Sequence, residues 1–153
     1  NGWAPLQKRL NTRRLEISAW AICASRRALD MIVDYAPQRV TFGVPLSDRQ
    51  AVQWWVTEAK TNIHACRLMA QHAALKIDNG MDVSSEMSLL KAFSTEMAWT
   101  ITDRAMQVYG GMGVSKESPL YLLAEHMRLS RIYEGPTEVH KGRVARDIFS
   151  GRF

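Results

Sequence analysis

The chain has 153 residues, 46% of them hydrophobic, as expected for one globular domain that needs no metal or disulfide to support its core. Its formal net charge is +5. No apolar run reaches the length of a membrane span, and no segment resembles a signal peptide. The basic residues are scattered and are not interleaved with aromatic residues, which argues against nucleic-acid binding.

Helical periodicity predicts a long first helix over residues 6–35 and a second helix that begins after Pro37 and the turn at 43–45. Ser47 and Gln50 are expected to form a capping box at the start of this second helix. The first apolar stripe contains Leu15, Ala19, Ile22, Leu29 and Val33. The second contains Val52, Trp55, Val56, Ala59, Ile63, Cys66, Ala70 and Ala73.

Asn79 and Gly80 are expected to end the second helix, because glycine tolerates a left-handed cap. Asp82 or Ser84 is expected to cap a third helix, which ends at the glycines of 110–113. Its stripe contains Leu90, Phe93, Met97, Ile101, Ala105 and Val108. The remaining apolar pattern is split between residues 120–129 and a last helix that follows Gly135 and Pro136.

These elements predict an all-α fold: an antiparallel up-down four-helix bundle with an additional short helix before the last helix. No alternating strand pattern competes with this assignment. Cys23 and Cys66 are expected to be buried small hydrophobes in a reducing compartment. The adjacent Trp54 and Trp55 point to different sides of their helix, so at least one is expected to face another subunit or domain.

Several chemistries are excluded by the spacing of the polar residues. A di-iron site needs Glu-x-x-His pairs, but the four histidines are preceded three residues earlier by Thr61, Met69, Leu123 and Thr137. The sequence contains neither Cys-x-x-Cys nor His-Glu-x-x-His, so no metal site is predicted. The glycine-rich run at 110–113 follows a helix, whereas the phosphate-binding turns of P-loop and Rossmann folds follow a strand. The run is therefore not predicted to be such a turn.

Three ordered segments resemble the signatures of the acyl-CoA dehydrogenase family. Residues 39–46 with Gln50 resemble Arg-x-x-Phe-Gly-x-x-Leu…Gln, and residues 107–113 resemble Gln-x-x-Gly-Gly-x-Gly. Residues 132–135 resemble Ile-Tyr-Glu-Gly, the family signature that holds the catalytic base. The order and spacing match, and the resemblance covers essentially the whole chain.

The resemblance implies that residues 1–153 are the C-terminal helical bundle of an FAD-dependent enzyme whose N-terminal helical domain and middle β-domain lie outside this chain. In the family, FAD binds between the middle domain and this bundle and reaches the neighbouring subunit. Arg39 would pair with the diphosphate of that neighbour's FAD, because its planar guanidinium matches phosphate oxygens. The implied cofactor contacts are Arg39, Phe42, Gln50, Gln107, Gly110 and Gly111.

The implied reaction removes the α-proton of an acyl-CoA thioester while a β-hydride passes to flavin N5, and the resemblance makes Glu134 the catalytic base. Arg14, Tyr133 and Gly135 are the implied substrate contacts, with a plain surface charge as the alternative for Arg14. Some relatives carry the base at the position of Arg13, where an arginine cannot act as one. Many members have threonine at the position of Pro136, so a hydroxyl contact to the flavin is not expected here.

The resemblance also implies an acyl-CoA substrate, a homodimer or homotetramer built through the bundle, and an electron-accepting flavoprotein as redox partner. An acyl-CoA oxidase is the alternative enzyme, whereas monooxygenase relatives often lack this glutamate. By itself the chain is expected to be a non-catalytic assembly module, because the family's middle domain carries most flavin contacts. A bacterial cytoplasm, a mitochondrial matrix and a peroxisome all fit, and the acyl chain length is not readable from these residues.

Overall fold

Five α-helices make up most of the protein, whose computed structural model describes residues 2–153 apart from the side chains of Trp3, Ala4 and Lys8. The elements in chain order are α1 (Trp3–Tyr35), β1 (Val40–Thr41), β2 (Val44–Pro45), the 3-10 turn η1 (Leu46–Asp48), α2 (Gln50–Asp78), α3 (Ser84–Tyr109), the 3-10 turn η2 (Gly110–Met112), α4 (Pro119–Ser130) and α5 (Thr137–Phe149). The predicted all-α fold is confirmed, including the short helix before the last one.

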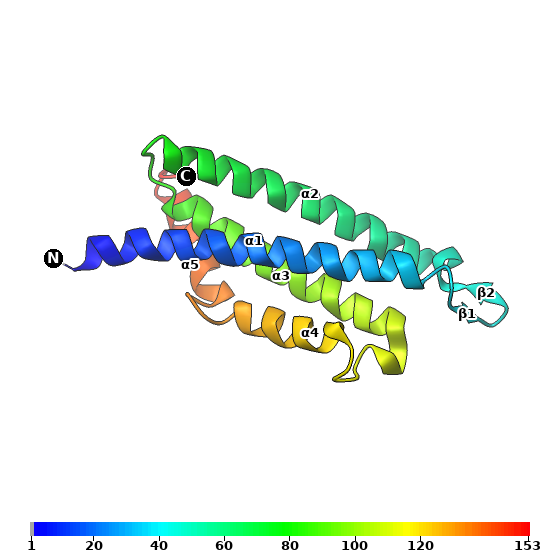
Figure 1. Ribbon diagram of the computed structural model, residues 1–153. Coiled ribbons are helices and arrows are strands. Elements are labelled where there is room, and N and C mark those ends of the chain that lie inside the picture. Colours follow the sequence, from blue (N-terminus) through cyan, green and yellow to red (C-terminus); the bar gives the residue numbers. More distant parts are fainter. Residues whose placement is uncertain (1) are drawn as a thin grey trace.

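Helix α3 is the central element of the bundle, in contact with α1, α2, α4 and α5. The three long helices run side by side, the β1–β2 hairpin projects from one end, and α5 lies toward the other end (Figure 1). Because α3 has neighbours on several sides, polar residues on it are buried together with apolar ones. The buried polar residues of α3 are Ser88, Lys91, Ser94, Thr95 and Thr102.

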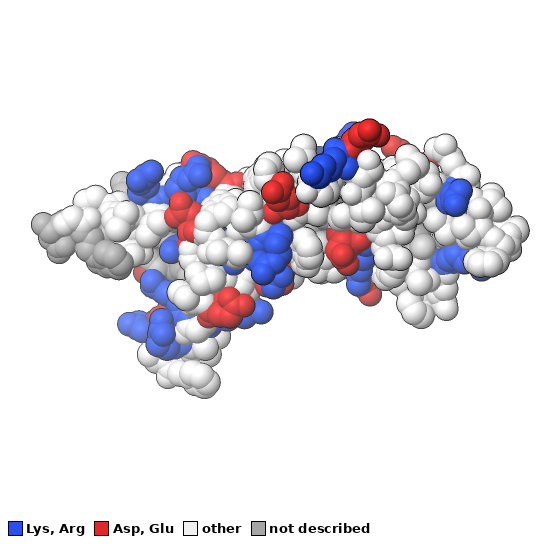
Figure 2. All heavy atoms as spheres, turned by 90° about the horizontal axis from the view of Figure 1, so that it is seen from below, with Lys and Arg blue, Asp and Glu red and all other residues white. Residues whose placement is uncertain are grey.

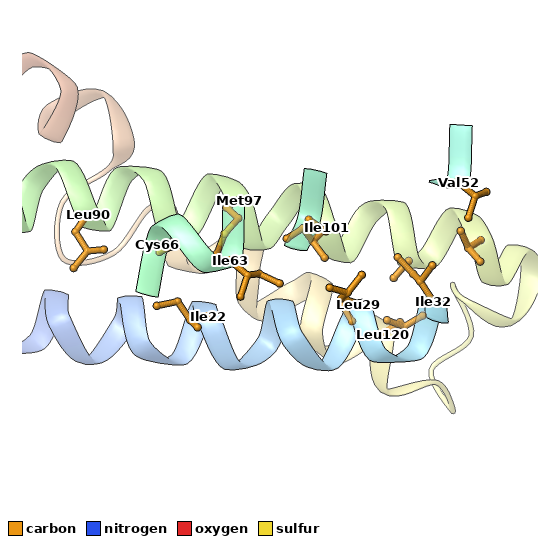
Figure 3. Packing of buried hydrophobic residues seen from close by; sticks show 14 of the residues in the cluster. Ile22, Leu29, Ile32, Val52, Ile63, Cys66, Leu90, Met97, Ile101 and Leu120 are labelled. Atoms are coloured by element: carbon orange, nitrogen blue, oxygen red, sulfur yellow. The ribbon is translucent and has the colours of Figure 1, made fainter. Parts of the chain in front are cut away.

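The apolar core lies between the long helices. Side chains from α1, α2 and α3 meet there, with Leu120 of α4 at one edge (Figure 3). The predicted α2 stripe is confirmed, because all its members are buried or packed against the core. The α1 stripe is wrong at Ala19 and Val33, which are exposed. The buried face of α1 instead includes Ala21, Ser25 and Ala28, small residues that allow close contact with neighbouring helices.

Most helix ends lie where the sequence predicts helix caps and stop signals. Gly80 adopts a left-handed φ of +70° after α2, as expected. Bonds from the Ser84 hydroxyl and backbone N–H hold the pKa of the Asp82 carboxyl below its ordinary value, and the backbone bond of 3.0 Å satisfies a free N–H of α3. The capping box of Ser47 and Gln50 is wrong, because Ser47 lies in η1 and Arg49 is the residue that precedes α2.

The hairpin is a feature that the sequence patterns did not predict. Its two strands are antiparallel, and Phe42 and Gly43 form the tip with φ of +51° and +75°. Positive φ at both central residues is typical of a type I′ turn. The Arg49 guanidinium, just before α2, donates to the Thr41 carbonyl over 2.6 Å and supports the hairpin. Two-residue strands are too short to show an alternating pattern.

The cysteines and tryptophans agree in part with expectation. Cys66 is buried as predicted, whereas Cys23 is exposed. Trp54 is 58% exposed while Trp55 packs against the core, so the two do face different sides. The side chain of Trp3 lies outside those described. In the described part of the chain, no helix is both long and apolar enough to cross a membrane. Acidic side chains lie among the basic ones on the face shown in Figure 2.

Candidate functional site

Glu134 lies in the short loop between α4 and α5, in an unusual backbone conformation. Its φ is +54°, and that of the following Gly135 is +97°. A left-handed non-glycine residue costs of order 1–3 kcal/mol and persists only where the surroundings hold it. The backbone N–H of Thr137 donates to the carbonyl of Arg131 over 3.1 Å and closes the loop. The strained position of Glu134 therefore calls for partners that fix it.

Three side chains from three different helices bind two of the carbonyl oxygens of this loop; we call Arg14, Lys91 and His140 the loop clamp. The carbonyl of Glu134 accepts from Arg14 Nε at 3.3 Å and lies 3.2 Å from His140 Nε2. The next carbonyl, of Gly135, accepts from Lys91 Nζ at 2.7 Å. The clamp joins α1, α3 and α5 at the residue that the sequence predicts as the base.

The clamp brings the buried ammonium of Lys91 close to the half-buried guanidinium of Arg14. Burial lowers the pKa of Lys91 to about 8, and repulsion from Arg14 adds to the shift. Attraction by Glu134, Glu138 and Glu96 opposes it. Lys91 is fully buried, and a lysine is rarely so without a strong reason.

His140 completes the clamp as a neutral donor. Burial, then repulsion from Arg14 and Lys91, lowers its pKa to about 4, so its ring is uncharged near neutral pH. Because the carbonyl of Glu134 can only accept, Nε2 must carry the ring proton. A Cβ added to Gly135 would lie 2.9 Å from this Nε2. Glycine is therefore required at 135 by both its backbone conformation and its contact with the histidine.

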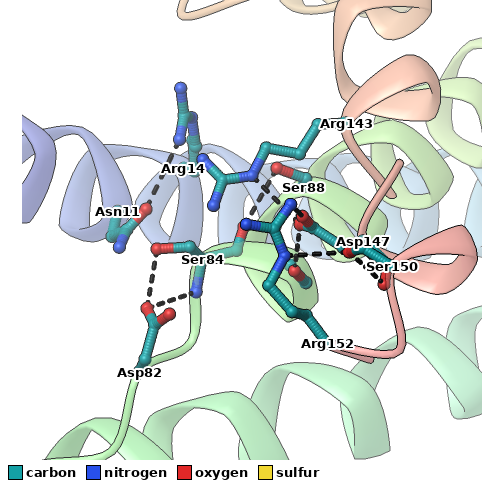
Figure 4. A network of polar contacts seen from close by, with 10 residues as sticks. Asn11, Arg14, Asp82, Ser84, Ser88, Arg143, Asp147, Ser150 and Arg152 are labelled. Atoms are coloured by element: carbon teal, nitrogen blue, oxygen red, sulfur yellow. Dashed lines mark hydrogen bonds and ion pairs between the residues drawn. The ribbon is translucent and has the colours of Figure 1, made fainter. Parts of the chain in front are cut away.

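A polar network fixes the other side of Arg14 and the end of α5 (Figure 4). Arg14 donates to Asn11 over 3.4 Å and lies near Arg143. Arg143 pairs with Asp147 at 3.2 Å, and the Ser85 hydroxyl on α3 donates to the same carboxylate at 2.5 Å. These bonds connect α5 to α3 and so fix the position of His140 on α5 relative to Lys91 on α3.

The second group of predicted residues lines a cavity of about 450 Å³ at the hairpin end of the bundle. It is lined in part by Arg39, Gln107, Gly110 and Gly111. The ends of α1 and α3 meet here because Tyr35 stacks on Tyr109, with ring centroids 4.2 Å apart. A Cβ added to Gly111 would meet nothing within 4 Å, so its backbone faces open space. The structure thus brings together two motifs that lie far apart in the sequence.

The remaining predicted residues lie outside both clusters or at their edges. Phe42 is 99% exposed at the tip of the hairpin, and the exposed Gln50 begins α2. Tyr133 is 38% exposed beside Glu134, and burial of its ring raises the pKa of its hydroxyl. The hydroxyl of Thr137 is buried and finds no hydrogen-bond partner among the described residues. It cannot replace the hydroxyl that Pro136 lacks.

The two clusters lie far apart on one chain. Tyr35, at the cavity, and Arg14, at the clamp, are 21 residues apart on α1. At a rise of about 1.5 Å per residue the separation is about 32 Å. The described residues also include no group of three or more His, Cys, Asp or Glu side chains placed to hold a metal ion.

Lys91 and His140 are the site residues that the sequence patterns missed. Lys91 shares the helix spacing of Ser94, Thr95, Ala98 and Thr102, and such a stripe of small residues signals close packing against a second helix. The apolar stripe on the other face of α3 hid this signal. His140 follows the loop glycine by five residues, and no motif marks it.

Comparison with known proteins agrees with the three motifs. The family model for the acyl-CoA dehydrogenase C-terminal domain matches residues 1–149. The chain is 36% identical over 151 residues to (R)-benzylsuccinyl-CoA dehydrogenase of Thauera aromatica and 31% identical over 147 residues to the NADH-dependent acryloyl-CoA reductase of Anaerotignum propionicum. These matches cover 98% and 96% of this chain, which spans 37% of the length of each relative.

A solved structure shows the same fold. Butyryl-CoA dehydrogenase from Megasphaera elsdenii superposes with a TM-score of 0.87 at 29% sequence identity. The match covers 94% of this chain and 37% of that one.

Proposed function

Because the chain belongs to the acyl-CoA dehydrogenase family, as a C-terminal domain, we propose that it is part of a longer FAD-dependent enzyme that dehydrogenates an acyl-CoA thioester between its α- and β-carbons. Glu134 takes the α-proton in this reaction. The proposal covers the whole enzyme's activity, to which this chain contributes the base and part of the cofactor site.

The observation that carries the proposal is the conformation of Glu134. The backbone of Glu134 is left-handed and its carbonyl is bound by Arg14 and His140, so the carboxylate extends from a fixed backbone position before substrate arrives. Such a fixed base suits removal of a weakly acidic α-proton, which requires close and constant positioning. An ordinary loop carboxylate would need neither the strained backbone nor the buried clamp.

The chain's residues fit FAD at the cavity of the hairpin end. The Arg39 guanidinium suits a diphosphate, the Gln107 amide can bind polar groups, and the open space at Gly111 admits close approach of a ligand to the backbone. A flavin dinucleotide is shorter than the separation of about 32 Å between this cavity and the clamp. We therefore assign the cavity to the FAD of a neighbouring copy, within a homodimer or homotetramer.

In the proposed reaction the α-carbon–hydrogen bond breaks and its proton passes to the Glu134 carboxylate. Bound FAD would supply the acceptor for the β-hydrogen as hydride, which would allow the α- and β-carbons to become doubly bonded. The loop clamp holds the carbonyl side of Glu134, and the backbone N–H of the same residue would donate to the thioester oxygen and stabilise enolate charge. An electron-accepting flavoprotein would then reoxidise the cofactor.

The same carboxyl group serves a reductase by giving a proton to the α-carbon. The likeness to an acryloyl-CoA reductase makes this the second candidate function. The two candidate reactions would use the same site and differ in whether the acyl-CoA is dehydrogenated or the enoyl-CoA is reduced.

The test uses the full-length enzyme loaded with FAD. Mixed anaerobically with a panel of acyl-CoA thioesters, it should lose flavin absorbance and form the matching enoyl-CoA. Absence of bleaching with every thioester, together with NADH-driven reduction of an enoyl-CoA, would support the reductase instead. Hydrogen peroxide release during turnover in air would identify an oxidase.

A further inference from the structure

Among the described side chains, Lys91 is the largest that the bundle buries completely. It lies on α3, and its ammonium group reaches the loop ahead of α5. A buried ammonium usually has a carboxylate as its close partner. Here the close partner is a neutral backbone oxygen, the carbonyl of Gly135, at 2.7 Å.

This bond acts on the backbone that carries Glu134. Arg14 and His140 both bind the carbonyl of Glu134, so they hold the peptide group on its C-terminal side. Lys91 holds the next peptide group, after Gly135. With both peptide groups held, the left-handed Gly135 between them is restrained, and the carbonyl side of the left-handed Glu134 is fixed.

Stability alone does not account for this lysine. Burial and repulsion from Arg14 oppose its charge and outweigh the attraction by the surrounding glutamates, so that the pKa of Lys91 is lowered. Methionine at this position would remove the desolvation cost of a buried charge, which opposes the cost of leaving the Gly135 carbonyl without its donor. The anchor on Gly135 would be lost in either case.

We propose that Lys91 is a positioning residue for the Glu134 base, acting through its hydrogen bond to the carbonyl of Gly135. The inference rests on the proposed function of Glu134 and adds a residue that no sequence motif identified. Lys91 does not touch the reacting atoms. It restrains the loop, so its removal slows proton abstraction without abolishing the base.

The experiment compares Lys91→Met with Lys60→Met in the full-length, FAD-loaded enzyme. Lys60 is an exposed lysine on α2 and serves as the matched control. In the Lys91 variant, kcat per bound FAD should fall about 10- to 100-fold, the scale of a small misplacement of a catalytic group. KM should change less than about three-fold, since substrate binding is not what is lost.

Two further readouts separate positioning from a merely structural role. With α-deuterated substrate, the isotope effect on flavin bleaching should rise in Lys91→Met, because proton abstraction becomes more rate-limiting. Amide hydrogen exchange of the peptide spanning residues 131–137 should become faster. A structural role would lower yield and flavin content but leave the isotope effect of the loaded fraction unchanged.

Lys91→Gln, which keeps a shorter donor, should give intermediate values. Wild-type kcat per FAD and wild-type isotope effect in Lys91→Met would overturn the inference. Failure of both Lys91→Met and Lys91→Gln to bind FAD would also overturn the inference, because that result would show that Lys91 serves the stability of the fold. Glu134→Gln in the same series separates the two proposals: an active variant sinks the proposed function, whereas an inactive one beside a normal Lys91→Met sinks only this inference.

Discussion

The Lys91 ammonium and the Gly135 carbonyl oxygen lie 2.7 Å apart, in a bond that joins the N-terminal third of the central helix to the loop ahead of α5. Together with Arg14 and His140, this bond surrounds the one left-handed glutamate of the described chain with donors from three helices. The bundle thus stabilises the left-handed backbone conformation of the short loop at Glu134 and Gly135.

Gly135→Ala tests whether the loop depends on that conformation. The new Cβ would meet His140 Nε2 at 2.9 Å on a residue with φ of +97°. We expect a loss of about 1–3 kcal/mol in the free energy of unfolding, measured by urea denaturation of this chain. Gly142→Ala is the control, because Gly142 lies inside α5 with nothing within 4 Å of an added Cβ. It should stabilise by about 0.5–1 kcal/mol. Equal stability of the two variants would contradict the account of the loop.

His140 predicts a pH dependence of stability. Its pKa is about 4 in the folded chain against an ordinary value of 6.5, so the unfolded chain binds more protons between these values. Stability therefore falls as pH falls through this window, by up to about 3 kcal/mol from this group.

The measurement compares wild type with His140→Gln in urea titrations from pH 7 to about pH 4. The variant lacks the titrating ring, so its free energy of unfolding should decline less steeply. Acidic groups that also titrate are common to both proteins and cancel in the difference. Parallel curves would show that His140 is not buried as a neutral ring.

Arg39→Gln tests the assignment of the hairpin-end cavity to FAD. Loss of a charged hydrogen bond to phosphate costs about 1.5–3 kcal/mol, so the Kd of the full-length protein for FAD should rise about 10- to 100-fold. Arg26→Gln, at an exposed position on α1, is the control and should leave the Kd unchanged. An unchanged Kd in Arg39→Gln would remove the cavity from the cofactor site.

The fold was largely predictable because its signals are local. The α2 stripe has two long neighbours and a clear apolar face, so periodicity found every buried member. Gly80 and the glycine-rich run after Tyr109 end their helices for steric reasons that sequence reveals. The α1 stripe failed at Ala19 and Val33, because the buried face of α1 includes small residues such as Ala21 and Ala28, which give a weak apolar signal in sequence.

The site was predictable only where the resemblance supplied motifs. Glu134 and Arg39 belong to such motifs, and the structure adds that they lie at different ends of the bundle. Lys91 and His140 were not predicted, because each acts on a backbone carbonyl group, which has no side-chain signature in sequence. The carbonyl lies 44 residues away from Lys91 and 6 residues away from His140 in the sequence. A buried lysine is revealed by packing in three dimensions and not by periodicity.

Glu134→Gln, in the full-length FAD-loaded enzyme, tests the central claim most directly. The amide preserves size and cannot accept the α-proton, while the clamp binds only backbone at this position. Flavin content should match wild type, and the rate of anaerobic bleaching by acyl-CoA should fall about 10²- to 10⁴-fold, the range for loss of a general base. Bleaching at the wild-type rate would show that another group removes the proton and would contradict the assignment of Glu134.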